Sequence, residues 1–357
     1  MRAARLVFIA VGFSVVTWGL VTLDSVPRAV APETTMAIRV SQSNLVNSLD
    51  RPLLMLGVNR SGSEYECASG RGIFDGPISS ATVAAMANWG INAVRLPLNE
   101  DCWLGINVSP EYSGSRYRTA IESYVARLNS RGLRVILDLH WSAPGTQPAV
   151  GQSPMPDADH SVAFWRSVGT TFRRDPGVLF ELFNEPHAVT WSCWRSGCEM
   201  PGGWKAVGMQ SLLQAVRSSG ARQPVIVDGL KWANDLTGWI SHPLIDPLHQ
   251  LIAGFHVYPW NTCATPDCWT RQIDSLDKRV PVVTTEVGER DCRANFVLSY
   301  LDWAVKNRVS AMVWTWNTNQ GCRALIRNYR SGAPSRFGEA LRSFIRAHLA
   351  QIQMPHA

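Results

Sequence analysis

Residues 178–186 read Val-Leu-Phe-Glu-Leu-Phe-Asn-Glu-Pro, an apolar run that stops at a proline with an amide and a carboxylate beside it. The apolar side chains are typical of a buried central strand in a parallel sheet. Pro186 cannot donate a sheet hydrogen bond, so the strand should end there, with Asn184 and Glu185 at its carboxyl end. A carboxylate at such a place is costly to bury without a partner or a function. The alternative interpretation is a glutamate that caps a helix or forms an ion pair.

A second strand of the same kind lies far downstream. Residues 280–288 read Val-Pro-Val-Val-Thr-Thr-Glu-Val-Gly, a β-branched run that again places a glutamate, Glu286, near its end. A pair of carboxylates, such as these two at the ends of parallel strands, is what most enzymes use to hydrolyse a glycosidic bond.

Strand-like patterns recur along the chain, and helical patterns separate most of them. Apolar runs predict strands at residues 53–59, 92–98, 134–140, 178–186, 224–230, 251–258, 280–288 and 310–317. Helices are predicted at residues 79–89, 115–131, 160–173, 203–218, 292–306 and 337–349. This alternation predicts an α/β fold, a (β/α)8 TIM barrel, with a small hairpin before it within residues 38–53. No linker or repeat interrupts residues 32–357, so we expect one domain there.

Residues 1–31 have the pattern of an export signal. Two arginines precede an uncharged run over residues 6–23. This run is long for a cleaved peptide and just long enough to span a bilayer. The small-x-small motif at residues 29–31 is a poor cleavage site because Pro32 follows it. We therefore expect an extracytoplasmic protein, either secreted after removal of a signal peptide or held by an N-terminal membrane anchor.

The eight cysteines of an exported chain are expected to form disulfides. Zinc binding is the alternative, but an oxidising compartment and the lack of a histidine cluster beside the cysteines argue against it. All eight fall in loops that follow predicted strands, on one face of the barrel. Pairing neighbours predicts four bridges that clip long βα loops: Cys67–Cys102, Cys193–Cys198, Cys263–Cys268 and Cys292–Cys322.

The charge pattern and the motifs exclude several classes of partner. The net charge of +6 comes from scattered arginines, which predicts a solvated surface and no binding of nucleic acid. No strand ends in a glycine-flanked serine, and no His-x-x-x-His motif or aspartate cluster suggests a metal. We expect neither a metal nor another cofactor.

Polar and aromatic residues gather at the carboxyl ends of the predicted strands: Arg95, His140, Asn184, Glu185, His256, Tyr258, Glu286 and Trp316. Each alone has a structural interpretation, because a strand histidine is more often a hydrogen-bonded core residue and a strand arginine more often an ion-pair partner. Together they predict a polar ring around two glutamates, at the end of the barrel where such folds place their catalytic groups.

This set of residues resembles glycoside hydrolase family 5, the large cellulase and mannanase family of (β/α)8 enzymes. The resemblance extends over residues 38–349 and rests on Asn184-Glu185-Pro186, on the Glu286 strand, on His256-Val257-Tyr258, on Arg95 and on His140. Two short stretches are similar to an actinobacterial branch of that family: residues 57–62, and residues 138–141, the second of which ends in Trp141.

The resemblance implies a retaining mechanism with Glu185 as acid/base and Glu286 as nucleophile. It also implies that Asn184 binds the sugar 2-hydroxyl, that Arg95 and Tyr258 hold Glu286, and that Trp316 forms the floor of the −1 subsite.

Two further carboxylates could compete with these roles. Glu181 lies lower in its strand and Glu289 lies beyond Gly288 in a loop, so both are interpreted as structural. Arg95 must be paired, since it cannot lose its charge, and two partners remain open. Asp138 would make it purely structural, whereas Glu286 would make it a support of the nucleophile.

Tryptophans supply the evidence on substrate. Aromatic faces pack against the C–H faces of pyranose rings, although any one tryptophan has core packing as an equal alternative. Eight of the fifteen fall at or just beyond predicted strand ends, which predicts a groove for a glycan chain: Trp103, Trp141, Trp191, Trp194, Trp232, Trp260, Trp269 and Trp316.

The sequence therefore predicts a retaining endo-β-1,4-glucanase, a monomer that acts on β-linked oligo- or polysaccharides. The alternatives within the same chemistry are an endo-β-mannanase, an exo-β-glycosidase and a transglycosylase. A non-catalytic carbohydrate-binding barrel is the alternative from another class, and the presence of both glutamates argues against it.

Overall fold

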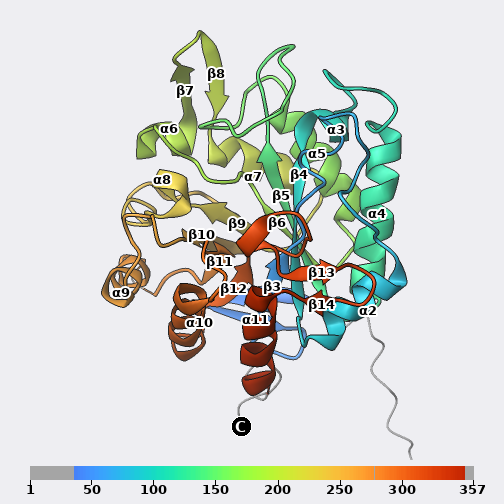
Figure 1. The fold of residues 1–357 in the computed structure, drawn as a ribbon. Helices are drawn as coiled ribbons and strands as arrows, with labels where there is room; N and C mark the ends of the chain where they lie inside the picture. The colour runs from blue at the N-terminus through green and yellow to red at the C-terminus, as the bar shows by residue number, and fades with distance from the viewer. Residues whose placement is uncertain (1–35, 277, 350–357) are drawn as a thin grey trace, which may run out of the picture. The chain divides into compact units, whose positions relative to one another are not determined.

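The computed structural model describes residues 36–276 and 278–349 (Figure 1). The predicted signal peptide or anchor at residues 1–31 lies outside the described residues. Within the described ranges, no helix combines the length and the apolar character needed to cross a membrane.

Eight parallel strands close into a barrel, which confirms the predicted fold class. Each strand pairs with its neighbours in chain order, and the last pairs with the first. The strands are β3 (Leu56–Asn59), β4 (Ala93–Asn99), β5 (Arg134–Trp141), β6 (Val178–Glu181), β9 (Val225–Asp228), β10 (Leu251–Val257), β11 (Val282–Val287) and β12 (Ser310–Val313).

The predicted helices cover the outside of this barrel. They are α2 (Ser80–Asn88), α4 (Ser115–Asn129), α5 (Ser161–Phe172), α7 (Met209–Ser218), α10 (Asn295–Lys306) and α11 (Arg336–Ala347). The predicted hairpin is also present as β1 (Ile38–Ser41) and β2 (Asn44–Asn47), which pair in antiparallel register.

The loops at the carboxyl ends of the strands contain further elements that the sequence patterns did not predict. These are α3 (Glu100–Leu104), α6 (Trp191–Ser196), β7 (Gly197–Met200), β8 (Trp204–Val207), α8 (Leu230–Ala233), α9 (Pro266–Asp274), the short 3-10 helix η1 (Gly321–Arg323), β13 (Ile326–Asn328) and β14 (Ala333–Pro334). The prediction that a helix begins at residue 203 was wrong. Gly202 and Gly203 have positive φ angles and turn the chain into the β7–β8 hairpin, so the helix begins only at Met209.

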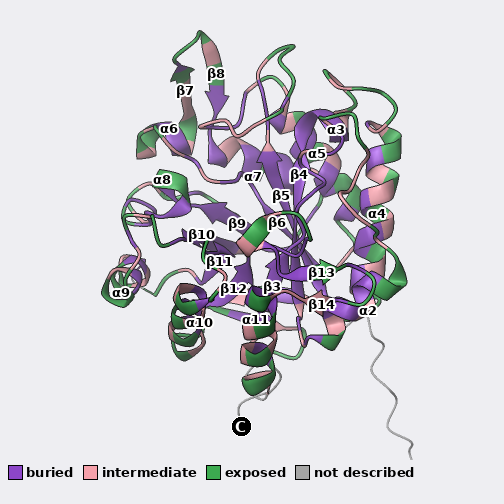
Figure 2. Cartoon of the chain, in the orientation of Figure 1, coloured by how far each residue is buried: buried purple, intermediate pink, exposed green. Residues whose placement is uncertain are grey.

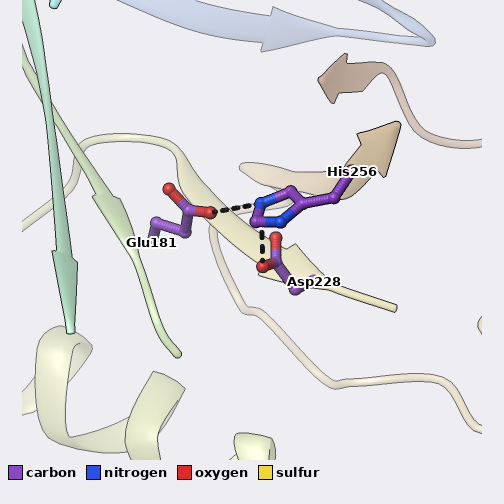
Figure 3. Close-up of side chains that lie close together, drawn as sticks. All are labelled: Glu181, Asp228 and His256. Carbon is purple, nitrogen blue, oxygen red and sulfur yellow. Dashed lines mark ion pairs between the residues drawn. The ribbon is translucent and has the colours of Figure 1, made fainter. Parts of the chain in front are cut away.

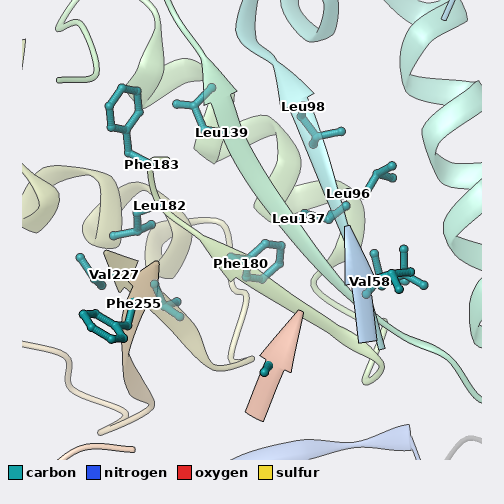
Figure 4. Close-up of a cluster of buried hydrophobic side chains, with 14 of the residues drawn as sticks. Val58, Leu96, Leu98, Leu137, Leu139, Phe180, Leu182, Phe183, Val227 and Phe255 are labelled. Atoms are coloured by element: carbon teal, nitrogen blue, oxygen red, sulfur yellow. The ribbon is translucent and has the colours of Figure 1, made fainter. Parts of the chain in front are cut away.

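The barrel strands are buried on both faces, as Figure 2 shows in purple. Their outward side chains pack against the helices in one large apolar cluster, part of which Figure 4 shows around Leu96, Leu137 and Phe180. The inward side chains form a separate apolar layer that includes Ile136 and Leu179. This two-sided burial explains why the strands read as continuous apolar runs.

The inward layer changes character towards the carboxyl ends of the strands. Side chains alternate along a strand, so residues two apart point to the same face. Four inward apolar residues are each followed, two positions on, by a charged one, in the pairs Ala93/Arg95, Ile136/Asp138, Leu179/Glu181 and Ile226/Asp228. The core of the barrel therefore ends in a buried layer of charge directly below the functional face.

The eight cysteines form the four disulfides that loop adjacency predicted. Two bridges join successive loops, Cys67–Cys102 and Cys292–Cys322. The other two, Cys193–Cys198 and Cys263–Cys268, each close a short segment of one loop. All four lie among the loops that carry the functional side chains, and a covalent link there limits loop motion.

Candidate active site

Glu185 and Glu286 meet at the carboxyl end of the barrel. Glu185 follows β6 and Glu286 belongs to β11. One carboxylate oxygen of each, together with a ring nitrogen of His256, lies within 4.8 Å of the others. Both glutamates line a pocket of about 660 Å³. Carboxyl groups about 5–5.5 Å apart are typical of retaining glycosidases, whereas inverting enzymes need roughly 6.5–9.5 Å.

The Arg95 guanidinium connects three carboxylates below this pocket. It donates two hydrogen bonds to Glu181, from Nε at 2.6 Å and from Nη2 at 3.1 Å. Nη1 donates to Glu286 at 2.7 Å, and Nη2 lies 2.9 Å from Asp138. Asp138 and Glu286, the two partners that the sequence left open, therefore both contact Arg95. Glu181, which was interpreted as structural, is the carboxylate that Arg95 binds through two hydrogen bonds. Burial would lower the pKa of Arg95, but these three carboxylates raise it well above the ordinary value.

Glu286 is fixed at both oxygens. Arg95 donates to Oε1, and the Tyr258 hydroxyl donates to Oε2 at 2.5 Å. Burial, and then the neighbouring charge of Glu286, raise the pKa of Tyr258, which keeps this hydroxyl protonated as a donor. Asn184 accepts a hydrogen bond from Arg95 through Oδ1 at 2.8 Å, so the same guanidinium also orients this amide.

Glu185 has a different set of partners. His256 Nδ1 lies 2.9 Å from Oε1, and Gln152 donates to Oε2 at 3.0 Å. Its backbone N–H donates to Asp228 at 3.2 Å, and its φ of 54° places it in the left-handed region that most non-glycine residues avoid. Burial raises the pKa of Glu185, but the hydrogen bond and charge of His256 outweigh it, so the pKa lies below the ordinary value.

His256 lies between the pocket and a deeper acidic pair. Figure 3 shows its ring beside Glu181 and Asp228, with Nε2 at 3.9 Å and 3.5 Å from their oxygens. Burial lowers the pKa of His256, but Glu286 and Asp228 raise it well above the ordinary value. Burial, and then the charge of Glu181, raise the pKa of Asp228 well above its ordinary value, whereas Arg95 and His256 lower the pKa of Glu181 against the effect of burial.

His256 also belongs to two groups of side chains with donor atoms close enough to hold a metal, one with Glu181 and Asp228 and one with Glu185 and Glu286. Both ring nitrogens, however, already face hydrogen-bond partners, since Nε2 lies 3.0 Å from Thr285 Oγ1 and Nδ1 faces Glu185. An imidazolium donates at both nitrogens and has no lone pair for a metal. The arrangement therefore favours a bound proton at His256.

His140 completes the ring of predicted polar residues. Its Nδ1 lies 2.6 Å from Asp138, and this carboxylate raises the pKa of His140 although burial opposes the shift. The Trp314 indole stacks on the imidazole with ring centroids 5.7 Å apart. Asp138 thus serves both Arg95 and His140 and links the two sides of the ring.

Comparison with known proteins agrees with this geometry. Residues 58–320 match the family described as cellulase (glycosyl hydrolase family 5). The chain belongs to glycosyl hydrolase family 5.

Three relatives of this family 5 protein illustrate the likeness. Endoglucanase E-5 of Thermobifida fusca is 22% identical over 311 residues, which cover 83% of this chain and 57% of the relative, so this chain spans less than two thirds of that relative's length. A hyperthermophilic endocellulase from Pyrococcus horikoshii superposes with a TM-score of 0.68 at 19% identity, covering 89% of this chain and 99% of the other. The β-glucanase SdGluc5_26A of Saccharophagus degradans, solved with cellotetraose, has a TM-score of 0.67 at 20% identity, covering 88% and 94%.

The expected position of Trp316 was wrong. Trp316 is fully buried and packs edge-to-face on Trp89, with ring centroids 4.7 Å apart, so it cannot form the floor of a sugar subsite. Trp314 lines the pocket instead. Because β12 ends at Val313, both tryptophans lie beyond the strand, where its alternation no longer determines which of them faces the pocket.

The expected groove of eight tryptophans was also wrong for five of them, including Trp191, which lies outside the pocket lining. Trp141, Trp232 and Trp260 line the pocket, and Trp191 packs partly buried against Trp194. The others are at most 1% exposed and belong to the core: Trp103, Trp194, Trp269 and Trp316. In these four positions the alternative of core packing was correct.

Several functional neighbours were missed by the sequence reasoning. Gln152 and Glu64 come from loops whose paths no periodicity predicts, and both line the pocket. Asp228 ends a strand like the predicted residues do, so the same strand-end rule could have selected it. Glu289, interpreted as structural, accepts the backbone N–H of Val297 at 2.8 Å near the start of α10.

We predict that Arg95→Lys lowers kcat by roughly a hundredfold and also destabilises the fold by about 3–5 kcal/mol. An ammonium cannot reproduce the donors to Glu181 and Glu286 at once, so a buried carboxylate loses its partner. Arg217→Lys is the matched control, because Arg217 pairs bidentately with Asp246, which lies outside the pocket lining. This control should lose stability and keep kcat. Wild-type kcat in Arg95→Lys would show that the guanidinium only supports the fold.

Glu64 provides a prediction on pH. Burial raises its pKa to about 7, against which His140 and the backbone N–H of Gly62 act only partly. As pH rises from about 4.5 to 7, the unfolded chain loses this proton while the folded chain keeps it, so stability falls through that window.

Glu64→Gln removes this loss, because the amide oxygen still accepts from Gly62 and carries no charge. Relative to the wild type, the variant should gain on the order of 3 kcal/mol between pH 4.5 and pH 8, measured by urea unfolding. Glu122→Gln, at an exposed site on α4, is the control and should follow the wild-type profile. A constant difference between Glu64→Gln and the wild type at both pH values would contradict the assignment.

Proposed function

We propose that this protein hydrolyses internal β-1,4 linkages of β-glucan with retention of configuration. The observation that carries the proposal is the pair Glu185 and Glu286, with carboxylate oxygens within 4.8 Å and with different hydrogen-bond partners. Spacing of this kind suits a double displacement, in which one carboxylate attacks the anomeric carbon and the other transfers protons.

Glu286 is the proposed nucleophile. Arg95 and Tyr258 donate to its two oxygens and thereby aim the carboxylate into the pocket. Attack by Glu286 forms a covalent glycosyl ester and breaks the bond to the leaving oxygen. The adjacent Asn184 amide, whose buried Nδ2 has no hydrogen-bond partner among the described residues, is the proposed donor to the 2-hydroxyl of the same sugar.

Glu185 is the proposed acid/base. It shares a proton with His256 along the 2.9 Å contact between Oε1 and Nδ1, and transfer to the carboxylate gives the acid that protonates the leaving oxygen. In the second step Glu185 takes a proton from water, which attacks the glycosyl ester and releases Glu286. A nucleophile must stay ionised, whereas a general acid must carry a proton. This difference explains why the two carboxylates have different hydrogen-bond partners.

The substrate class follows from the pocket lining and from the relatives. Trp141, Trp232 and Trp260 offer aromatic faces for pyranose rings, and Trp314 lies beside His140 next to the reacting groups. The relatives carry the names endoglucanase and endocellulase, and one was solved with cellotetraose. These names favour β-glucan over mannan and internal cleavage over exo action.

Export from the cytoplasm is the proposed location, because four disulfides persist in an oxidising compartment. Cleavage or retention of residues 1–31, a monomeric state and a single domain over residues 32–357 stay predictions.

We predict that Glu286→Ala abolishes turnover of an aryl β-cellobioside and that azide restores it with an α-glycosyl azide as product. Glu185→Ala should retain much more activity on that substrate, because a good leaving group needs little acid assistance, and azide should give the β product.

Glu289→Gln is the matched control, since this glutamate lies just beyond the same strand and bonds Val297 rather than the pocket. It should turn over like the wild type. A β-glycosyl azide from Glu286→Ala would reverse the two assignments, and full activity of both alanine variants on β-glucan would refute them.

A further inference from the structure

An arginine of the main pocket is unused by the proposed chemistry. Arg323 is the last residue of η1, and its half-buried side chain lines the pocket. Its guanidinium has no ion pair and no hydrogen bond within residues 36–276 and 278–349. Lys231 of the same lining, by contrast, lies 2.8 Å from Asp235. Because an arginine keeps its charge and offers several N–H donors, Arg323 is available to an acceptor on a ligand.

The position of this arginine is fixed by the backbone around it. Cys322, the preceding residue, is bridged to Cys292, so the loop after β12 is tied to the loop after β11. The N–H of Arg323 donates to the carbonyl of Gln320 at 3.1 Å, and its own carbonyl accepts from the N–H of Thr315 at 3.0 Å. A loop held at these points needs little ordering when a ligand binds.

A second arginine lies on the other loop of this bridge. Arg290 is exposed, and its guanidinium lies over Trp260, 4.4 Å from the ring centroid. Trp260 lines the pocket. Within the described ranges Arg290 forms no ion pair, and its neighbour Asp291 lies 3.7 Å from Arg293 instead. Arg290 and Arg323 therefore give the wall formed by the β11 and β12 loops a positive potential, which favours an anionic ligand.

The loop that carries Arg323 lies across the barrel from the proposed acid/base. In the closed sheet, β12 is the fourth strand from β6 in either direction. Glu185 follows β6, and a general acid must lie against the leaving oxygen, so the leaving half of the chain departs on that side. The half that becomes bonded to Glu286 therefore extends towards the loop after β12. Arg323 is placed to contact the sugars of this glycone half.

A carboxylate is the ligand group that these charges fit. The planar guanidinium binds a carboxylate through two parallel N–H···O bonds, which are roughly twice as strong as neutral hydrogen bonds. The hydroxyls of a neutral glucan need no positive charge, and side-chain amides can bind them. Glu185 and Glu286 would repel a carboxylate beside the cleaved bond, so the group belongs on a sugar farther along the glycone half.

We propose that Arg323 binds a carboxylate on the glycone half of the chain, and that the substrate class is a β-1,4-glucan bearing acidic groups. Arg290 adds to the attraction from the neighbouring loop. The proposal rests on the proposed hydrolase function and specifies its substrate. Arg323 takes no part in the bond cleavage, so its effect is on the choice of substrate. The carboxylate can belong to a uronic acid unit of the main chain or to a side group on a glucose unit.

The test uses three aryl β-cellotriosides, which place all three sugars on the glycone side and the aryl ring on the leaving side. The first is neutral. In the second, the two glucose units farthest from the aryl group are oxidised at C6 to glucuronate, and in the third the same two units carry carboxymethyl groups on O6. At about pH 6 these carboxyl groups are ionised, because their pKa is about 4. Comparison of the two acidic substrates distinguishes a main-chain acid from a side group.

For the wild type, kcat/KM should be higher for at least one acidic trioside than for the neutral one. About 0.5 M NaCl should reduce this preference, since salt screens charge pairs. Arg323→Gln keeps a polar side chain but removes the charge, and it should lower the ratio of acidic to neutral kcat/KM about fivefold to tenfold. Arg323→Lys keeps the charge and should retain more of this ratio than Arg323→Gln does.

Arg330→Gln is the matched control, because it removes the same charge from an exposed position outside the pocket lining. It should leave the ratio of acidic to neutral kcat/KM within twofold of the wild type. The melting temperature of each variant, measured in the same buffer, verifies that the variant folds.

An unchanged ratio in Arg323→Gln, or a wild type that prefers the neutral trioside to both acidic ones, would overturn the acidic-substrate proposal while the hydrolase function stands. An equal fall of the ratio in Arg330→Gln would show a general effect of net charge and would overturn the proposal as well. A wild-type enzyme that hydrolyses none of the three triosides would overturn the proposed function, and the substrate proposal with it.

Discussion

A single buried guanidinium connects the fold to the chemistry. Arg95 is fully buried, cannot lose its proton, and lies on the inward face of β4, where only other strands can supply its counter-charges. Asp138 on β5, Glu181 on β6 and Glu286 on β11 supply them. The barrel must therefore close with these strands in one register for Arg95 to be tolerated at all. The same register places Glu286 in the pocket, so the site is a consequence of burying this charge.

The remaining charge below the pocket is balanced by protons. Glu181 is ionised between Arg95 and His256, which hold its pKa at about 2 against the effect of burial. Burial and the charge of Glu181 raise the pKa of Asp228, and His256 can share a proton with Glu185. Gly254 makes this arrangement possible, because a Cβ there would lie 1.9 Å from an Asp228 oxygen. Glu286 and Glu185 thus have different environments: Glu286 contacts the guanidinium of Arg95 and the phenol of Tyr258, whereas Glu185 contacts the imidazole ring of His256.

Sequence reasoning was strongest where a local pattern determines the outcome. Two-sided burial makes each barrel strand readable, and cysteines confined to strand-to-helix loops pair with the nearest partner. It failed where the chain leaves its regular elements. Beyond the end of β12, Trp314 lines the pocket and Trp316 is buried, and Gly202 and Gly203 turn the chain so that residues 204–207 form the second strand of a hairpin instead of a helix. The bidentate pairing of Arg95 with Glu181 depends on the register between strands of the closed barrel. The sequence pattern of a single strand does not contain this register.

The central claim is that Arg95 and Tyr258 aim Glu286 as the nucleophile of a retaining glycosidase. The most direct test is to incubate the wild-type protein with a 2-deoxy-2-fluoro-β-cellobioside carrying a good leaving group, and to locate the label by peptide mass spectrometry. The slow second step of such a substrate should trap one fluorocellobiosyl group per protein, attached to Glu286. Attachment to Glu185, or inversion of configuration without any covalent adduct, would contradict the account.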